Sequence, residues 1–261
     1  MLKKRLIGVV TVRDNLAIQS FGYTRYLPLG RPDWLVQNLD RWGADEILVQ
    51  VIDRSTASRR PNFDLLDRLA RLGLSTPLIY GGGIHSIEDG LEVIKRGADR
   101  IALDSALFDE PSIFRELGFR LGTQALIASM PVSIVDSCLS RFDYRSRMMT
   151  EINSEFIEEY VLGAVSEIML TDWRHEGYPE SFDDKLIDLF PHSEISLIAF
   201  GGINQESQME ALLARSNVSA VAVGNFLNYR EHAVQRIREK LVSNLIRPAS
   251  YPTDFNSISN V

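Results

Sequence analysis

Two glycine turns carry the clearest chemical signal in this sequence. Gly81–Gly83 follows the apolar run 77–80, and Gly201–Gly202 follows the apolar run 197–200. Glycine lets backbone N–H groups approach a ligand closely, and a helix that begins just after the turn adds partial positive charge. One such turn is equally compatible with a tight strand-to-helix connection that binds nothing. Because the same order occurs twice, we interpret the turns as two phosphate-binding sites.

The segments that position these turns repeat as well. The run GADEILV at 43–49 is echoed by GAVSEIML at 163–170, and a helix-like segment and a further apolar run follow each turn. A repeat of this length indicates two similar half-units. Periodicity predicts strands at 5–11, 46–52, 77–80, 100–103, 124–130, 167–171, 194–199 and 220–223, and helices at 32–42, 61–72, 87–96, 111–119, 156–162, 182–190, 205–214 and 230–245.

This alternation predicts an α/β protein, a (β/α)8 TIM barrel built from two similar half-barrels, rather than an open doubly wound sheet. We expect the barrel to span 1–247 and a C-terminal tail to span 248–261. Residues 12–30 are expected to form a polar loop. Residues 131–150 show no clean period and are either a long loop or an irregular hairpin. In such a barrel the functional groups lie at the C-terminal ends of the strands.

Composition limits the partners. With 45% hydrophobic residues, 24% charged residues and a net charge of −7, the chain has an ordinary globular profile and no basic excess for nucleic acid. No apolar run approaches the roughly 18 residues of a membrane span, and no signal peptide is evident, so we expect a cytoplasmic protein. Cys138 is the single cysteine, which excludes disulfides and cysteine-rich zinc sites within one chain. We expect no metal and no cofactor.

A set of short motifs identifies a family resemblance. The chain resembles the HisF-like family, the cyclase subunit of imidazole glycerol phosphate synthase, over nearly its whole length. The matching motifs are KRLI at 4–7, GADE at 43–46, GGGIH at 81–85, GADR at 97–100, EIMLT at 167–171 and GG at 201–202.

The resemblance implies a long bisphosphate ligand, with one phosphate at each glycine turn. By position, one phosphate would be held by Gly82, Gly83 and Ser105, and the other by Gly202, Gly224 and Asn225. Asp104 stands where the family usually has Asn. A carboxylate next to a phosphate is repulsive, so the resemblance predicts a weaker first site and a stronger second site that carries no acidic side chain.

The catalytic positions depart from the family pattern. The family uses two aspartates as general acid and base, and Thr11 and Pro131 occupy those positions here. Neither side chain exchanges a proton near neutral pH, so ordinary lyase-type cyclase chemistry should be lost or strongly reduced. Substitute carboxylates could come from Asp53 and Asp172, and also from Asp104 and Asp136. These carboxylates could equally be solvated loop or helix-capping residues.

The opposite end of the barrel keeps the family pattern. In the family, ammonia from a glutaminase enters through four charged residues at the N-terminal ends of the strands. Arg5, Glu46, Arg100 and Glu167 occupy those positions, and Asp99 lies where the family contacts its partner. Two cations and two anions can close a ring of ion pairs. The alternative is that the ring only seals the barrel.

Three functional hypotheses follow. The first is an ammonia-conducting subunit that works as a heterodimer with a HisH-like glutaminase and supplies a third, sugar-amidating enzyme for a surface-glycan precursor. The second is a divergent imidazole glycerol phosphate synthase cyclase in histidine biosynthesis. The third is a non-catalytic scaffold that binds a phosphorylated small molecule.

Overall fold

The structure is a closed barrel of parallel strands. It is a computed structural model that describes residues 3–228, 233–241 and 246–247. The sheet order β10-β11-β12-β1-β4-β5-β6-β7 is closed by pairing of β7 with β10, which confirms the predicted (β/α)8 barrel. The barrel strands are β1 (Arg5–Arg13), β4 (Glu46–Val51), β5 (Leu78–Gly81), β6 (Arg100–Leu103), β7 (Leu126–Val135), β10 (Glu167–Asp172), β11 (Ser196–Phe200) and β12 (Val218–Val223).

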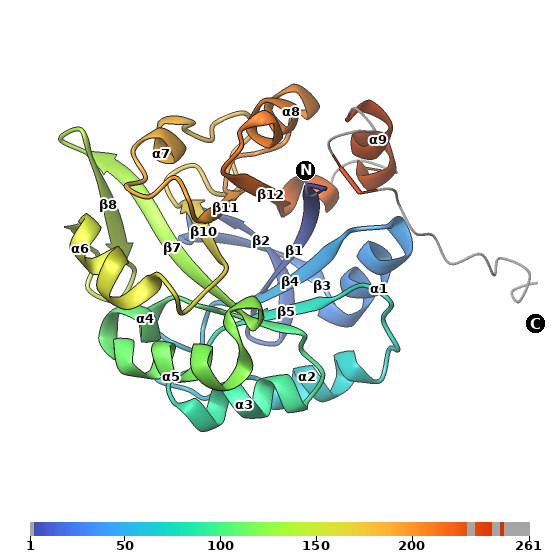
Figure 1. The fold of residues 1–261 in the computed structure, drawn as a ribbon. Coiled ribbons are helices and arrows are strands. Elements are labelled where there is room, and N and C mark those ends of the chain that lie inside the picture. Colours follow the sequence, from blue (N-terminus) through green and yellow to red (C-terminus); the bar gives the residue numbers. More distant parts are fainter. Residues whose placement is uncertain (1–2, 229–232, 242–245, 248–261) are drawn as a thin grey trace, which may run out of the picture.

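Helices surround the barrel on its outside (Figure 1). They pack through leucine-rich faces against the outward side chains of the strands. The α2 helix is capped by the Asn62 side chain and α3 by that of Ser86, which each accept a backbone N–H from the first turn. The α-helices are α1 (Pro32–Trp42), α2 (Phe63–Ala70), α3 (Ile87–Lys95), α4 (Ser105–Asp109), α5 (Pro111–Leu121), α6 (Ser154–Phe156), α7 (Lys185–Asp188), α8 (Glu206–Ala214) and α9 (Ala233–Lys240).

Alternation along the strands separates two apolar cores. Side chains such as Leu6 and Val10 of β1 face the helices, whereas Ile7 and Val9 face the barrel interior. The interior set, called the inner core below, contains several small side chains. Its members are Ile7, Val9, Leu48, Ile79, Ala102, Ile127, Met169, Ile198, Phe200, Ala220 and Ala222.

Two hairpins extend the sheet at the C-terminal end of the barrel. The predicted polar loop at 12–30 is wrong, because β2 (Leu16–Phe21) and β3 (Arg25–Gly30) form an antiparallel hairpin that continues β1. Residues 131–150 form a hairpin, one of the two predicted alternatives, but a regular one: β7 continues to Val135 and pairs with β8 (Cys138–Asp143), which pairs with β9 (Met148–Glu151). The turn at 136–137 has positive φ at both central residues, as two-residue hairpin turns require.

Several predicted helices have different bounds. The helix expected at 182–190 contracts to Lys185–Asp188, and the one expected at 156–162 becomes α6 followed by a π-helical turn, η2 (Ile157–Val161). The α4 helix was not predicted. Short 3-10 turns, η1 (Thr123–Ala125) and η3 (Asn225–Asn228), complete the described elements. Only Ala233–Lys240 of the helix expected at 230–245 is described as helix, and the expected tail 248–261 lies outside the described residues. Among the described helices, none has the length and apolarity to cross a membrane.

Candidate functional site

Four charged side chains close a ring at the N-terminal end of the barrel. Arg5, Glu46, Arg100 and Glu167, called the charge ring below, are each at most 8% exposed. Arg5 contacts Glu46 at 2.9 Å and also pairs with Glu167. Arg100 contacts Glu46 at 3.3 Å and Glu167 at 2.8 Å. Each charge therefore has two partners of opposite sign, and the predicted convergence of the four residues is observed.

The ring is held by its surroundings as well as by its own charges. Arg100 Nε donates to the Gln124 carbonyl oxygen at 2.8 Å, and Ser219 donates to Glu167. Burial alone would raise the pKa of Glu167, but the guanidinium charges of Arg5 and Arg100 outweigh it and lower that pKa. The Glu167 carboxylate is thus charged at neutral pH. Asp99, which directly precedes β6, is exposed and accepts the Leu78 N–H at 2.8 Å.

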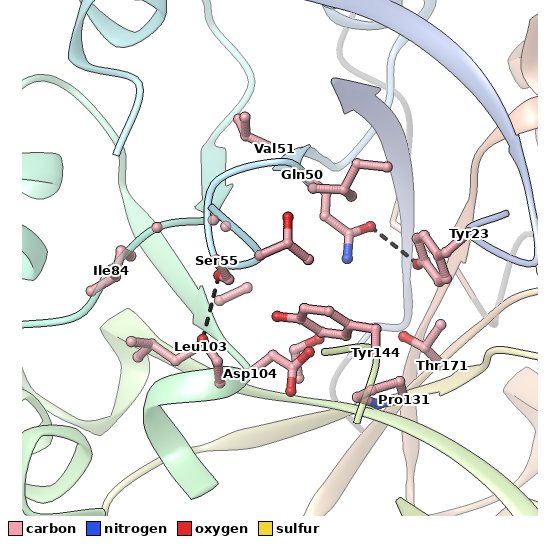
Figure 2. Close-up of a pocket in the computed structure, with 18 of the residues that line it drawn as sticks. Tyr23, Gln50, Val51, Ser55, Ile84, Leu103, Asp104, Pro131, Tyr144 and Thr171 are labelled. Carbon is pink, nitrogen blue, oxygen red and sulfur yellow. Dashed lines mark hydrogen bonds between the residues drawn. The ribbon is translucent and has the colours of Figure 1, made fainter. Parts of the chain in front are cut away.

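The first glycine turn lines a pocket at the C-terminal end of the barrel (Figure 2). This first-turn pocket reaches into the barrel interior, because its lining includes Leu48, Ala102 and Met169 of the inner core. Tyr23, from the hairpin turn between β2 and β3, donates to Gln50 Oε1 at 3.3 Å across one side of the pocket. The remaining lining residues are Tyr26, Val51, Ile52, Ser55, Thr56, Gly81, Gly82, Gly83, Ile84, Leu103, Asp104, Ser105, Ser129, Pro131, Phe142, Tyr144 and Thr171.

Asp104 supplies a carboxylate to this pocket. It directly follows β6, and burial raises its pKa to about 7 although Arg141 lowers it. The nearest cation, Arg141 Nη2, lies 3.6 Å from Asp104 Oδ1, which is beyond hydrogen-bond range. A carboxyl group with a pKa near neutrality can both accept and donate a proton. Of the four candidate carboxylates, Asp104 is the one that lines the first-turn pocket.

The other three candidate carboxylates lie elsewhere. Asp172 is 2% exposed on the outer side of β10, where its Oδ2 accepts the Asp183 N–H at 3.0 Å and contacts His175 Nδ1 at 2.7 Å. Asp53 accepts the Asp14 N–H at 3.2 Å, and Asp136 is exposed in a hairpin turn. None of these three carboxylates lines either pocket, and the replacement of the family pair by Asp53 or Asp172 stays a prediction.

Thr11 and Pro131 occupy the two positions at which the family resemblance implies catalytic aspartates, and their side chains are a hydroxyl group and an apolar ring. Pro131 lines the first-turn pocket, and Thr11 is buried on β1, where it pairs in register with Gln50 of β4. Neither position offers a carboxyl group. The described part of the chain also contains no cluster of three or more His, Cys, Asp or Glu side chains that could hold a metal ion.

The second glycine turn lines a separate pocket, called the second-turn pocket. Gly201, Gly202, Gly224 and Asn225 all line it, and the binding of a phosphate by Gly202, Gly224 and Asn225 stays a prediction. The Asn225 side chain is already engaged, since its Nδ2 donates to the Ser20 carbonyl at 2.6 Å and its Oδ1 accepts the Ser20 N–H at 3.2 Å. Only backbone groups of these residues are therefore free for an anion. The other lining residues are Phe21, Glu176, Gly177, Tyr178, Pro179, Phe200, Ile203, Asn204, Ala222 and Phe226.

The prediction that no acidic side chain lines the second site is wrong, because Glu176 lines the second-turn pocket. Glu176 is 3% exposed, and burial raises its pKa to about 7. Its Oε2 accepts the Ser20 hydroxyl at 2.9 Å and the Tyr23 N–H at 3.3 Å, while its carbonyl accepts the Gly22 N–H at 2.8 Å. Glu176 thus fastens the β2–β3 hairpin over the barrel. No sequence motif marked it, because its partners lie far away in the chain.

Sequence comparison assigns the chain to a family. The family model described as "Histidine biosynthesis protein" matches residues 12–233. The chain belongs to this family. It is 28% identical over 235 residues to "Putative imidazole glycerol phosphate synthase subunit hisF2" of Vibrio vulnificus, covering 89% of this chain and 86% of that protein. It is 27% identical over 241 residues to "Imidazole glycerol phosphate synthase subunit HisF" of an Exiguobacterium species, covering 91% and 93%.

A HisF-like chain from a Thermotoga species, named "Imidazole glycerol phosphate synthase subunit HisF", is 28% identical over 244 residues, covering 92% of this chain and 95% of that one. The HisF-like resemblance predicted from short motifs is therefore confirmed over the barrel.

Proposed function

We propose that this HisF-like chain is the ammonia-conducting subunit of a glutamine amidotransferase that works with a HisH-like glutaminase. The observation that carries the proposal is the closed charge ring at the N-terminal end of the barrel. Two cations and two anions exclude other ions from the entrance, because every charge is already paired. A small uncharged molecule such as ammonia can pass when one pair opens.

The barrel interior suits such a passage. Above the ring lies the inner core, in which Ala102, Ala220 and Ala222 leave more room than larger residues would. An apolar lining favours ammonia over ammonium, since an unpaired cation would lose its hydration there. The first-turn pocket shares Leu48, Ala102 and Met169 with the inner core, so ammonia that crosses the core would arrive in that pocket.

The glutaminase would dock on the N-terminal face around the charge ring. Asp99 is exposed on this face and is the contact residue implied by the family. The protein names of the relatives include the word "subunit", which also supports a partner.

The ammonia has two candidate acceptors. Thr11 and Pro131 in place of an acid-base pair favour an outside acceptor, which we propose is a sugar precursor of a surface glycan, amidated by a third enzyme. The names of the relatives favour the second candidate, a cyclase subunit of imidazole glycerol phosphate synthase. In that case Asp104, with a pKa of about 7 inside the first-turn pocket, is the group placed to exchange protons.

Co-expression with the HisH-like glutaminase of the same organism tests the proposal. We expect the two chains to co-purify and the HisF-like chain to raise glutaminase activity. Addition of the standard aminated bisphosphate intermediate then separates the acceptors: cyclised product supports the synthase, and its absence supports an outside acceptor. If no glutaminase binds, the chain is a scaffold that binds a phosphorylated molecule, and the ammonia proposal is wrong.

A further inference from the structure

The four charges of the ring are spaced unevenly around the barrel. In the closed strand order, Arg5 on β1 and Glu46 on β4 come from neighbouring strands. One strand separates Glu46 from Arg100 on β6, and one strand separates Arg100 from Glu167 on β10. Two strands, β11 and β12, separate Glu167 from Arg5. The Arg5–Glu167 pair therefore spans the widest gap in the ring.

Ser219 of β12 lies in this gap and contacts both charges. Its hydroxyl oxygen accepts an N–H of Arg5 Nη2 at 3.2 Å, and its O–H donates to Glu167 Oε1. The same carboxylate oxygen accepts a hydrogen bond from Arg5 Nη2. Ser219 thus forms a second, hydroxyl-mediated link between the two charges that come from the most widely separated strands.

A β-bulge places Ser219 at this point. Leu197 of β11 lies opposite Val218 of β12. The next pair is Ile198 with Ala220, so Ser219 is an extra residue of β12. Bulges are common at the rims of barrels, where they change the direction of a side chain. This bulge brings the Ser219 hydroxyl into contact with the charge ring.

A buried lysine fixes the backbone that leads to Ser219. Lys4 is 8% exposed, and its ammonium group donates to the carbonyl oxygens of Arg215 and Ser216 at 3.1 Å and 3.3 Å. Lys4 directly precedes Arg5 in the chain. Successive side chains at the start of β1 therefore hold the segment before β12 and the charge ring, which keeps Ser219 and Arg5 in register with each other.

The single proton of the Ser219 hydroxyl has two acceptors within reach. One is the Glu167 carboxylate, and the other is the Leu197 carbonyl oxygen at 3.2 Å. A hydrogen bond to an ionised carboxylate is roughly twice as strong as one to a neutral carbonyl. The proton therefore points to Glu167 while the Arg5–Glu167 pair is closed, and it turns to Leu197 when that pair opens. Because opening exchanges the stronger bond for the weaker one, the hydroxyl stabilises the closed ring more than the open ring.

We propose that Ser219 is a fifth member of the charge ring and the positioning residue of the ammonia inlet, holding the Arg5–Glu167 pair closed across β11 and β12. The inference rests on the proposed function, because it assigns the seal of that inlet to an uncharged residue outside the four ion-paired ones. Ser219 is half-buried at the N-terminal end of the barrel. Without its hydroxyl, water enters between Arg5 and Glu167 more often, and the inlet leaks.

Two substitutions of nearly equal shape separate the effect of the hydroxyl from that of side-chain volume. Ser219→Thr keeps the hydroxyl, whereas Ser219→Val carries a methyl group in its place, and both β-branched side chains suit a strand. Ser166→Ala is the matched control. Ser166 directly precedes Glu167, and its buried hydroxyl oxygen has no hydrogen-bond partner among the described residues, so its removal should leave the ring unchanged.

Exchange of guanidinium protons with water measures how often the ring opens. The purified chain and its variants are labelled with ¹⁵N-arginine, the exchange rates are measured by NMR under identical conditions, and the Arg5 signals are identified by their loss in Arg5→Lys. Arg238 is the internal reference, because it pairs with Asp45 at 2.7 Å and both side chains are less than a tenth exposed.

The exchange of the Arg5 protons should be about tenfold faster in Ser219→Val than in Ser219→Thr, because Ser219→Val loses a hydrogen bond to a charged group. In Ser219→Thr and Ser166→Ala the Arg5 rate should stay close to that of the unmodified chain. The Arg238 rate should be the same in all of these proteins. Circular dichroism melting of each variant confirms that it is folded.

Three results would overturn the inference. Equal Arg5 exchange in Ser219→Val and Ser219→Thr would show that the hydroxyl does not hold the pair, and slower exchange in Ser219→Val would show that it favours the open ring. Equal acceleration of Arg5 and Arg238 in Ser219→Val would assign Ser219 a general role in stability instead. The experiment uses the HisF-like chain alone, so its failure and a failure of glutaminase binding are separate results.

Discussion

Neutralising one member of the charge ring should destabilise the barrel and uncouple glutamine hydrolysis from ammonia use. Glu167→Gln keeps the side-chain shape but leaves Arg5 and Arg100 to share Glu46. Removal of one partner from a buried ion pair costs about 3 to 5 kcal/mol, because the remaining charge stays desolvated. For a chain of this size, each kcal/mol lowers the melting temperature by about 2 to 4 °C, which gives a fall of about 6 to 20 °C.

The melting temperatures of Glu167→Gln and of its control are compared at neutral pH. The pKa of Glu167 is lowered in the folded state, so its stabilising effect is fully present above its unfolded pKa and is lost as the pH falls through the folded pKa. Glu116→Gln is the matched control. Glu116 pairs with Arg120 at 2.6 Å on an exposed helix surface, and such a pair contributes less than about 1 kcal/mol.

Calorimetry and a coupled assay measure the two consequences. Glutamine-dependent product should fall in Glu167→Gln, while high concentrations of ammonium salts should still support it, because free ammonia can reach the pocket from the open C-terminal end. The double variant Arg100→Gln/Glu167→Gln should melt at a higher temperature than the sum of the single changes predicts, since it restores charge balance. A melting temperature for Glu167→Gln equal to that of Glu116→Gln, together with full glutamine-dependent activity, would refute both the ring energetics and the gate.

Three further outcomes are expected. Together with its glutaminase, the chain should cyclise the aminated bisphosphate more slowly than an ordinary family member, because Thr11 and Pro131 cannot exchange protons. The expected loss of rate is on the order of 10² to 10⁴ for each missing acid or base, measured by chromatography of the product. A rate within about tenfold of an ordinary family member would contradict this. Burial raises the pKa of Glu176 to about 7, so the folded state loses stability as the pH rises from about 4.5 to 7. In denaturant titrations, Glu176→Gln should therefore remove a pH dependence of the unfolding free energy of up to about 3 kcal/mol between pH 5 and 8. If Glu176→Gln kept the pH profile of the unmodified chain, the raised pKa of Glu176 would be wrong. Gly224→Ala should weaken phosphate binding at the second-turn pocket in calorimetric titrations with little loss of stability, because a Cβ there has its nearest neighbours at 3.7 Å or more; unchanged binding would place the anion elsewhere.

The sequence predicted those parts of the molecule that depend on local pattern. Each barrel strand is an apolar run, and the charges of the ring stand at or near strand starts, so their meeting at one end follows from the fold. The helix at Pro32–Trp42 and the strand at Arg100–Leu103 have the predicted bounds.

The missed features depend on contacts between distant segments. The β2–β3 hairpin has a partly exposed, tyrosine-rich and glycine-containing sequence, and its strand conformation is stabilised by β1 and by Glu176. Tyr144 enters the first-turn pocket only because the β8–β9 hairpin folds back over the barrel. The raised pKa of Asp104 arises from burial that no local pattern reveals.

The closed form of the charge ring also restricts how the sequence can change over time. Each charge is shared by two neighbours, so any single replacement that removes a charge leaves an unbalanced buried charge, and a neutral path needs two coordinated replacements. Side chains of the first-turn pocket come from several strands and from the loops that follow them, and they can be exchanged one at a time. Mutational drift should therefore leave the charge ring unchanged while the opposite end of the barrel diversifies, so that new ligand chemistry can arise above an old ring.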